Sequence, residues 1–200
     1  MNWTEVTLTP ASLKRALDWT AAKQAFKVEH LVKDKWYDRH SSSEAVDLMG
    51  RLGEMAAVTA FGLDYDVLNW EIGHAGDSGA DFTAFGLTWD AKTSTLTDLI
   101  FDDAAAFKAD AAVLVQMLGD RRHPVDGTFR VGGVCSRARF MRECEQHDYG
   151  HGTRLRLHVG RLVPVRQFLD EAAIRQFWGD VQKNDPVGST ESHANALANV

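Results

Sequence analysis

Residues 79–94 read GADFTAFGLTWDAKTS, and this stretch decides the fold. Residues 81–85 and 87–92 are expected to form two strands separated by a glycine, which accepts the backbone angles of a tight turn. Side chains two positions apart on a strand project to the same face, so Asp90 and Lys92 project together. The second strand therefore places a carboxylate and an amine side by side at its end.

Hydrophobic periodicity predicts the remaining elements on either side of this stretch. Gly50 and Gly53 interrupt one helix, and two glycines inside a helix indicate that another element packs very close to it. Helices are predicted at 10–30, 30–38, 43–60, 101–108, 137–146 and 168–177, and strands at 67–72, 111–118, 129–134, 155–159 and 162–165. This order predicts an α/β protein with a central mixed sheet of four or five strands flanked by helices.

The composition predicts one globular domain with small additions. The chain has 200 residues, of which 44% are apolar and 25% charged, and it contains no apolar run long enough to cross a membrane. The N-terminal residues lack a secretory pattern, and two cysteines are too few for a disulfide scaffold, which favours a cytoplasmic protein. We expect an N-terminal helical segment at 1–42, a core at 43–178 and a flexible tail at 179–200.

The charge is distributed unevenly along the chain. The net charge is −6, yet residues 121–166 contain ten arginines, no lysine and four acidic residues, a local charge of +6. The guanidinium group matches the geometry of a phosphate, so this segment suggests contact with nucleic acid. An ordinary solvated surface is the alternative interpretation of the same pattern.

Three acidic residues and a lysine make a candidate metal site. Asp81 begins the first strand of the opening stretch, Asp90 and Lys92 end the second, and Glu54 lies on the glycine-containing helix. Divalent ions such as Mg²⁺ bind one or two carboxylates together with water and phosphate oxygens. Such an ion activates water and neutralises charge on a phosphorus centre, and a neighbouring lysine orients the water.

In this order the four residues resemble the PD-(D/E)XK nucleases of the restriction-endonuclease-like superfamily. Residues 50–56, GRLGEMA, are similar to the G-x-x-G-E-x-A helix of many members, and residues 90–94, DAKTS, to the D-x-K-T-S strand end. Residues 133–140 and 162–168 are similar to later segments of small, often phage-encoded members. The resemblance covers roughly residues 43–170 and implies a restriction-endonuclease-like fold.

The resemblance also implies the activity and the roles of the site residues. Glu54, Asp81, Asp90 and the carbonyl of Ala91 would bind Mg²⁺ or Mn²⁺, and Lys92 would activate the attacking water in a deoxyribonuclease of replication, recombination or repair. Ala80 stands where these nucleases place proline. An endonuclease is favoured because no helical Gln-x-x-x-Tyr pair follows the core. DNA is the expected partner, and a homodimer is compatible with cutting both strands. The arginines expected to contact DNA phosphates are Arg137, Arg139 and Arg142.

Other interpretations of the sequence stay open. The protein could bind DNA with little turnover, or act on small nucleotides or another phosphate ester. Residues 33–40 are a second candidate for contact with nucleic acid. His74 could touch the substrate, Asp77 competes with Asp81 as the ligand, and Glu71 could support the site from outside. A zinc site is a further alternative, on Cys135, Cys144, His147 and His151.

Overall fold

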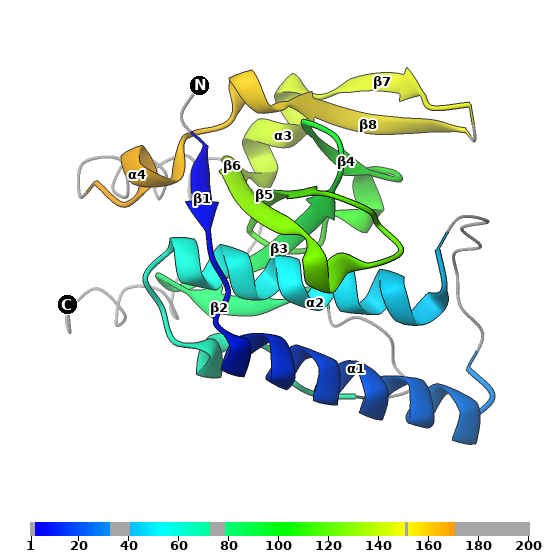
Figure 1. Cartoon of the computed structure of the whole chain (residues 1–200). Coiled ribbons are helices and arrows are strands. Elements are labelled where there is room, and N and C mark those ends of the chain that lie inside the picture. The colour runs from blue at the N-terminus through cyan, green and yellow to red at the C-terminus, as the bar shows by residue number, and fades with distance from the viewer. Residues whose placement is uncertain (1–2, 33–40, 73–78, 151, 171–200) are drawn as a thin grey trace.

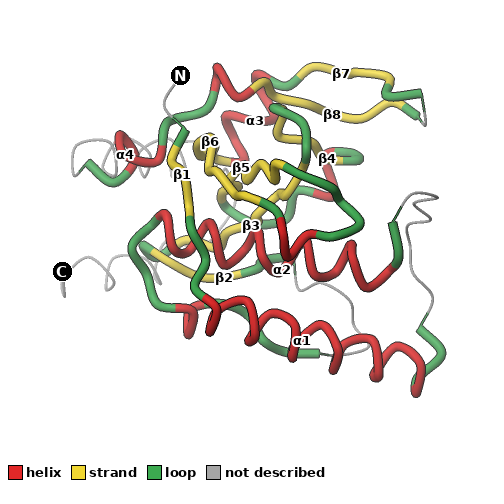
Figure 2. Tube along the Cα trace, in the orientation of Figure 1, coloured by secondary structure: helices red, strands yellow, loops and turns green. Residues whose placement is uncertain are grey.

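The computed structural model describes residues 3–32, 41–72, 79–150 and 152–170. Figure 1 shows the arrangement of the elements, and Figure 2 distinguishes helices, strands and loops in the same orientation. The helices are α1 (Pro10–Glu29), α2 (Ser43–Ala60), α3 (Arg137–Glu143) and α4 (Val165–Phe168). The strands are β1 (Thr4–Val6), β2 (Phe82–Ala84), β3 (Leu87–Ser94), β4 (Asp98–Phe101), β5 (Ala111–Leu118), β6 (Thr128–Ser136), β7 (Glu145–Asp148) and β8 (Thr153–His158).

Two sheets form the framework. The larger sheet has five strands in the order β1-β6-β5-β3-β2, and the smaller has three in the order β4-β8-β7. β3 and β5 run parallel, whereas the other neighbours in the larger sheet run antiparallel. The prediction of an α/β protein with a mixed five-stranded sheet is therefore confirmed at this level.

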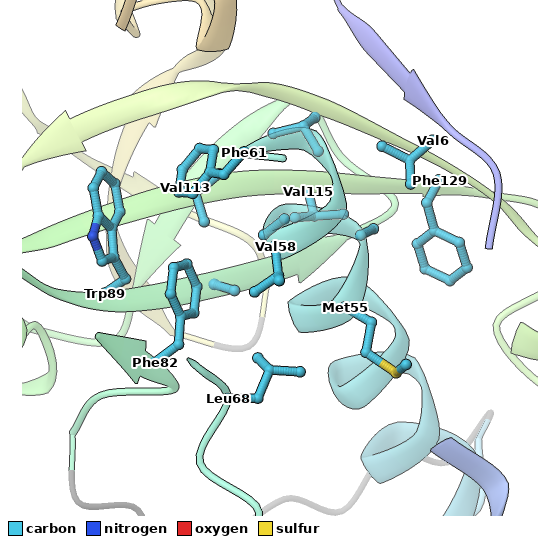
Figure 3. Packing of buried hydrophobic residues seen from close by; sticks show 14 of the residues in the cluster. Val6, Met55, Val58, Phe61, Leu68, Phe82, Trp89, Val113, Val115 and Phe129 are labelled. Carbon is cyan, nitrogen blue, oxygen red and sulfur yellow. The ribbon is translucent and has the colours of Figure 1, made fainter. Parts of the chain in front are cut away.

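Helix α2 packs across one face of the larger sheet, as Figure 3 shows. Ser42 caps the helix by accepting a hydrogen bond from the amide of Ala45, so the predicted start is confirmed. Its apolar stripe, including Met55 and Val58, is completely buried. The strands contribute apolar side chains to the same cluster, namely Val6, Phe82, Trp89, Val113, Val115 and Phe129.

A second cluster lies on the opposite face of the larger sheet. Phe101 stacks on Phe107 with ring centroids 4.2 Å apart, and Phe140 of α3 meets both rings edge-on. Leu114 of β5 joins this cluster, whereas its neighbour Val113 belongs to the first one. Because neighbouring side chains on a strand alternate in direction, β5 is buried on both faces, as its unbroken apolar sequence predicts.

Helix α1 forms an outer layer on α2, on the side away from the sheet (Figure 1). Its buried positions are small, at Ser12, Ala16 and Thr20, so it contributes little apolar surface. Asp47 of α2 binds the ammonium groups of Lys23 and Lys27 of α1. The interface between the two helices therefore depends strongly on polar contacts.

Replacing Asp47 by alanine is expected to destabilise the protein by about 1–2 kcal/mol, because two half-buried ammonium groups lose their counter-charge. The aspartate side chain is only 13% exposed, which limits screening by solvent. Urea unfolding would measure the change. Asp18→Ala is the control, since the Lys14–Asp18 pair is largely exposed and such pairs contribute less than about 1 kcal/mol. Equal effects of the two substitutions would contradict this account.

The strand predicted at 67–72 is wrong. The structure has a 3-10 turn, η1 (Tyr65–Val67), followed by a single bridge between Leu68 and Phe82. The side chain of Asp64 accepts a hydrogen bond from the amide of Tyr65, and the indole of Trp70 donates to the carbonyl of Tyr65. These local hydrogen bonds compete with strand pairing and fold the segment back on itself.

The helix predicted at 101–108 is also wrong. Phe101 ends strand β4, and a short 3-10 turn, η2 (Ala104–Ala106), follows, with the Asp103 carboxylate accepting from the amide of Ala106. The strand predicted at 162–165 reduces to one bridge between Val163 and Val134, since Pro164 cannot donate to a ladder. The predicted helix 168–177 does not continue through 169–170, because α4 (Val165–Phe168) ends where that helix was expected to begin. Residues 171–177 lie outside the described residues, as do 33–38 and the predicted tail.

Candidate functional site

Asp81 is fixed to the edge of β3 through its side chain as well as its backbone. Its amide donates to the carbonyl of Trp89 at 2.7 Å, which continues the antiparallel ladder of β2 and β3. One residue pair further, its carboxylate Oδ2 accepts from the amide of Ala91 at 2.6 Å. The side chain thus replaces a strand partner, and this places Asp81 directly beside the segment that carries Asp90.

Asp90 and Lys92 project from the same face of β3, as the alternation of the strand predicts. The Lys92 ammonium lies 2.8 Å from Asp90 Oδ1 and 4.9 Å from the centre of the Phe101 ring. This is the face covered by the second aromatic cluster. Asp90 is 5% exposed, so its carboxylate is largely removed from water and depends on such polar contacts.

Glu54 reaches this region because α2 approaches β3 very closely at the preceding residue. A Cβ atom on Gly53 would lie 1.7 Å from Oγ1 of Thr93, so only glycine fits against the strand there. The prediction of a close neighbour is confirmed at Gly53, whereas Gly50 has open space around it. The contact brings the backbone of α2 at Glu54 close to the end of β3, on the face that Thr93 occupies, whereas Asp90 and Lys92 project from the opposite face.

Arg51 is a buried cation at this site that the sequence patterns did not reveal. Its Nη1 lies 2.7 Å from Glu54 Oε2, and its Nη2 donates to the carbonyl of Asn69 at 3.0 Å. The guanidinium lies between two indole rings, 3.7 Å from the centre of Trp19 and 4.7 Å from that of Trp70. A charged residue on the apolar stripe of α2, one turn before Glu54, was the signal that could have revealed it.

Arg51 also acts electrostatically on the candidate site. Burial lowers the pKa of its guanidinium below the ordinary value, and the negative charges of Glu54 and Asp81 oppose that shift. The guanidinium therefore interacts electrostatically with the carboxylates of both Glu54 and Asp81. Glu54 and Asp81 come from different elements, so their common interaction with Arg51 connects α2 to the edge of β3.

The donor atoms around β3 suit a hard divalent ion in kind, but they do not form a complete cage. The Asp81 carboxylate bonds the amide of Ala91, and Asp90 precedes Ala91 on β3, so both offer oxygens close to this residue. The carbonyl of Ala91 points to the same strand edge as that of Trp89. Within the described ranges, no three side chains of His, Cys, Asp or Glu meet in a group that could hold a metal. Two carboxylates with a carbonyl nevertheless satisfy what Mg²⁺ takes from proteins.

The zinc alternative gains no support in the part of the chain that the structure describes. Cys135 is buried on β6 and Cys144 caps the end of α3, and neither joins a metal-ligating group there. His147 lies on β7, its ring against Tyr149, and His151 lies outside the described residues. Burial raises the pKa of both thiols, which opposes the thiolate that zinc requires.

The buried Cys135 thiol makes a testable contribution to alkaline stability. Burial raises its pKa from 9.0 to about 12, so the unfolded chain ionises first as the pH rises. Stability from this group is complete below pH 9 and is lost between about pH 9 and 12, by roughly 1 kcal/mol per pH unit. Denaturant unfolding should show a smaller alkaline loss for Cys135→Ala than for the wild type. Parallel losses in the two proteins would refute the assignment.

The arginines predicted to contact DNA belong to α3 and its start. Ser136 caps the helix as predicted, accepting from the amide of Arg139. Arg137 and Arg142 are exposed, whereas Arg139 is half-buried and its guanidinium binds Glu143.

Glu71, a candidate for supporting the site from outside, is exposed, and its amide donates to the Asn69 side chain. The other candidates, His74, Asp77 and residues 33–40, lie outside the described residues.

Comparison of the chain with protein-family models, with curated proteins and with solved structures finds no match. No helix in the described ranges has the length and apolarity needed to cross a membrane. The fold class is α/β, with a mixed five-stranded sheet and helices, and the function has to be argued from the residues of the site.

Proposed function

We propose that the protein is a metal-dependent nuclease that hydrolyses phosphodiester bonds in DNA. The observation that carries the proposal is the attachment of the Asp81 carboxylate to the Ala91 amide, beside the Asp90–Lys92 pair. The carboxylate of Asp90, the carbonyl of Ala91 and the ammonium group of Lys92 thus lie on three consecutive residues of β3, and the carboxylate of Asp81 is attached to the middle one. The order of these residues in the chain, with Glu54 before them, resembles that of the PD-(D/E)XK nucleases.

Each residue has a role that follows from its surroundings. Asp81, Asp90 and the carbonyl of Ala91 would hold Mg²⁺ or Mn²⁺. The bound ion supplies an acidified water molecule and neutralises negative charge on the phosphate. Lys92 is 34% exposed, so its ammonium can turn from Asp90 towards solvent and orient the attacking water.

Glu54 and Arg51 would contribute to the site from α2. Among the described residues Glu54 does not join Asp81 and Asp90 in one group of possible ligands, and the buried guanidinium of Arg51 holds its carboxylate in one orientation. Because Trp19 and Trp70 enclose the guanidinium, Arg51 has little freedom to follow a moving partner. Arg51 is thus a positioning residue, and Glu54 is the group that it presents to the metal or to a metal-bound water.

A cleavage panel tests the proposal directly. The purified protein is incubated with linear, supercoiled, single-stranded and four-way-junction DNA, with Mg²⁺, with Mn²⁺ or with EDTA. We expect cleavage of at least one substrate with either metal and none with EDTA. Nicking or linearisation of supercoiled DNA would identify an endonuclease. Lack of cleavage of all four substrates in both metals would reject the proposed activity.

A second function, DNA binding with little turnover, is favoured by the ion pairs in the site. Asp90 already contacts Lys92 and Glu54 already contacts Arg51, so two of the three carboxylates have a protein cation beside them. Such pairs reduce the affinity for an external cation. Calorimetric titration with MgCl₂ separates the two functions: an active enzyme takes up Mg²⁺ and loses the binding heat in Asp90→Asn, whereas a binding module gives no heat with either protein.

A further inference from the structure

Three arginines converge on one carboxylate where α3 meets the short 3-10 turn η4 (Val159–Arg161). Glu143 Oε1 lies 3.2 Å from Arg139 Nε and 3.4 Å from Arg142 Nη2, and Glu143 Oε2 lies 3.5 Å from Arg161 Nη2. Arg161 Nη1 also donates to the Glu143 carbonyl at 3.1 Å, at the end of the helix. Three positive charges thus surround one negative charge, and the group carries a net charge of +2.

The neighbouring sheet lacks this excess of positive charge. Arg154 of β8 pairs with Asp102, and Arg156 pairs with two acidic residues, Asp98 and Glu145. Each of these guanidinium groups therefore has at least one carboxylate of its own. The contrast indicates that the arginines around Glu143 are not present only to balance acidic neighbours.

Two of the three guanidinium groups are accessible from solvent. The side chains of Arg142 and Arg161 are 56% and 55% exposed, whereas that of Arg139 is 29% exposed. Exposed ion pairs at such distances contribute less than about 1 kcal/mol, so Arg142 and Arg161 keep most of their capacity to bind another anion. A guanidinium group presents two parallel N–H donors, which match the two free oxygens of a phosphodiester.

We infer that Arg142 and Arg161 form a binding site for a backbone phosphate of duplex DNA, with Glu143 as its built-in counter-charge. The inference rests on the proposed function, because it assumes that DNA is the ligand. Glu143 neutralises one of the three positive charges when DNA is absent, and its carboxylate competes with a phosphate for Arg142 and Arg161. Arg139, the least exposed of the three, keeps Glu143 in place. A bound phosphate supplies a second anion to the cluster of Arg139, Arg142, Arg161 and Glu143, and so lowers its net charge of +2.

Salt-dependent binding tests the site. A fluorescein-labelled duplex of about 20 base pairs is titrated with protein in EDTA, so that no cleavage occurs, at about 50 to 200 mM salt, and anisotropy gives the affinity. Arg142→Gln and Arg161→Gln should each weaken binding severalfold and reduce the slope of log affinity against log salt by about 0.9. Lys14→Gln is the control, because Lys14 is an exposed cation of α1 outside residues 121–166 and, like Arg142, pairs with one nearby carboxylate.

Glu143→Gln separates the binding role from a purely structural one. Removing the counter-charge raises the local charge to +3, so the variant should bind the duplex severalfold more tightly than the wild type. A carboxylate that served only to brace α3 would give weaker or unchanged binding when replaced. Thermal unfolding of each variant verifies that the fold is retained, and Arg142→Gln is the most secure probe because its ion pair is long and exposed.

The outcomes distinguish this inference from the proposed function. Slopes for Arg142→Gln and Arg161→Gln equal to that of Lys14→Gln would overturn the phosphate site, and the nuclease proposal would stand if the wild type still cleaved DNA. Weaker binding by Glu143→Gln would likewise overturn the role of the counter-charge. A wild-type protein with no salt-dependent affinity for duplex DNA would overturn the phosphate site, whereas the cleavage panel alone decides the nuclease proposal.

Discussion

Asp90→Asn should reduce the rate of DNA cleavage by at least about a hundredfold, because a neutral amide neither binds a divalent ion well nor pairs with Lys92. Asp90 is buried and forms an ion pair with Lys92 on the same face of β3. No other side chain can easily replace its carboxylate as a metal ligand. Initial rates on supercoiled plasmid in Mg²⁺ would measure the effect, with wild type and variant at equal concentration.

The control for this substitution is Asp126→Asn, which changes the same functional group at an exposed position of η3. We expect it to cleave at the wild-type rate. Circular dichroism and thermal unfolding of Asp90→Asn exclude loss of the fold as the cause. Wild-type rates from a folded Asp90→Asn protein would eliminate the mechanism in which Asp90 holds the metal.

Gly53→Ala should destabilise the protein by about 2–3 kcal/mol, even though alanine favours a helix by about 1 kcal/mol over glycine. The added methyl group would lie 1.7 Å from Oγ1, 2.8 Å from Cβ and 2.9 Å from Cγ2 of Thr93, so α2 must move away from β3. Denaturant unfolding would measure the loss. The displacement also moves Glu54 away from the end of β3, so we expect cleavage to fall as well.

Gly50→Ala provides the matched control, since a Cβ atom at Gly50 meets nothing within 4 Å. It should stabilise the protein by up to about 1 kcal/mol through helix propensity alone. Combining Gly53→Ala with Thr93→Ala removes the two atoms nearest and third-nearest to the new methyl group and should restore part of the stability. A Gly53→Ala protein as stable as Gly50→Ala would show that α2 and β3 are not in tight contact.

Elements with strong local signals could be predicted closely from the sequence. Helix α2 has the predicted bounds because a serine cap, a regular apolar stripe and a terminating turn all agree. Strand β5 also has the predicted bounds, since a run that is apolar except at Gln116, flanked by Asp110 and Gly119, indicates burial on both faces. At the site, alternation along β3 was enough to predict that Asp90 and Lys92 are neighbours.

The features that sequence patterns missed depend on distant partners. Strands β4 and β7 are short, and β7 is polar throughout, yet both pair with β8 to form the smaller sheet. Nothing local distinguishes such residues from a loop, because the stabilising hydrogen bonds come from the partner strand. Arg51 was missed for a similar reason: its place between Trp19 and Trp70 depends on two segments remote from it in the sequence.

Strand β1 has a consequence for synthesis of the chain on the ribosome. Among the strands of the described residues it pairs with β6 alone, with Thr4 opposite Val131 and Val6 opposite Phe129. β1 is synthesised before β6 and must therefore wait until residues 128–136 have been added before its partner exists. Until then β1 has unpaired backbone groups on both edges, and incomplete chains are vulnerable to association with one another. Slow translation after residue 136 would give β1 time to complete the sheet while the chain is still isolated.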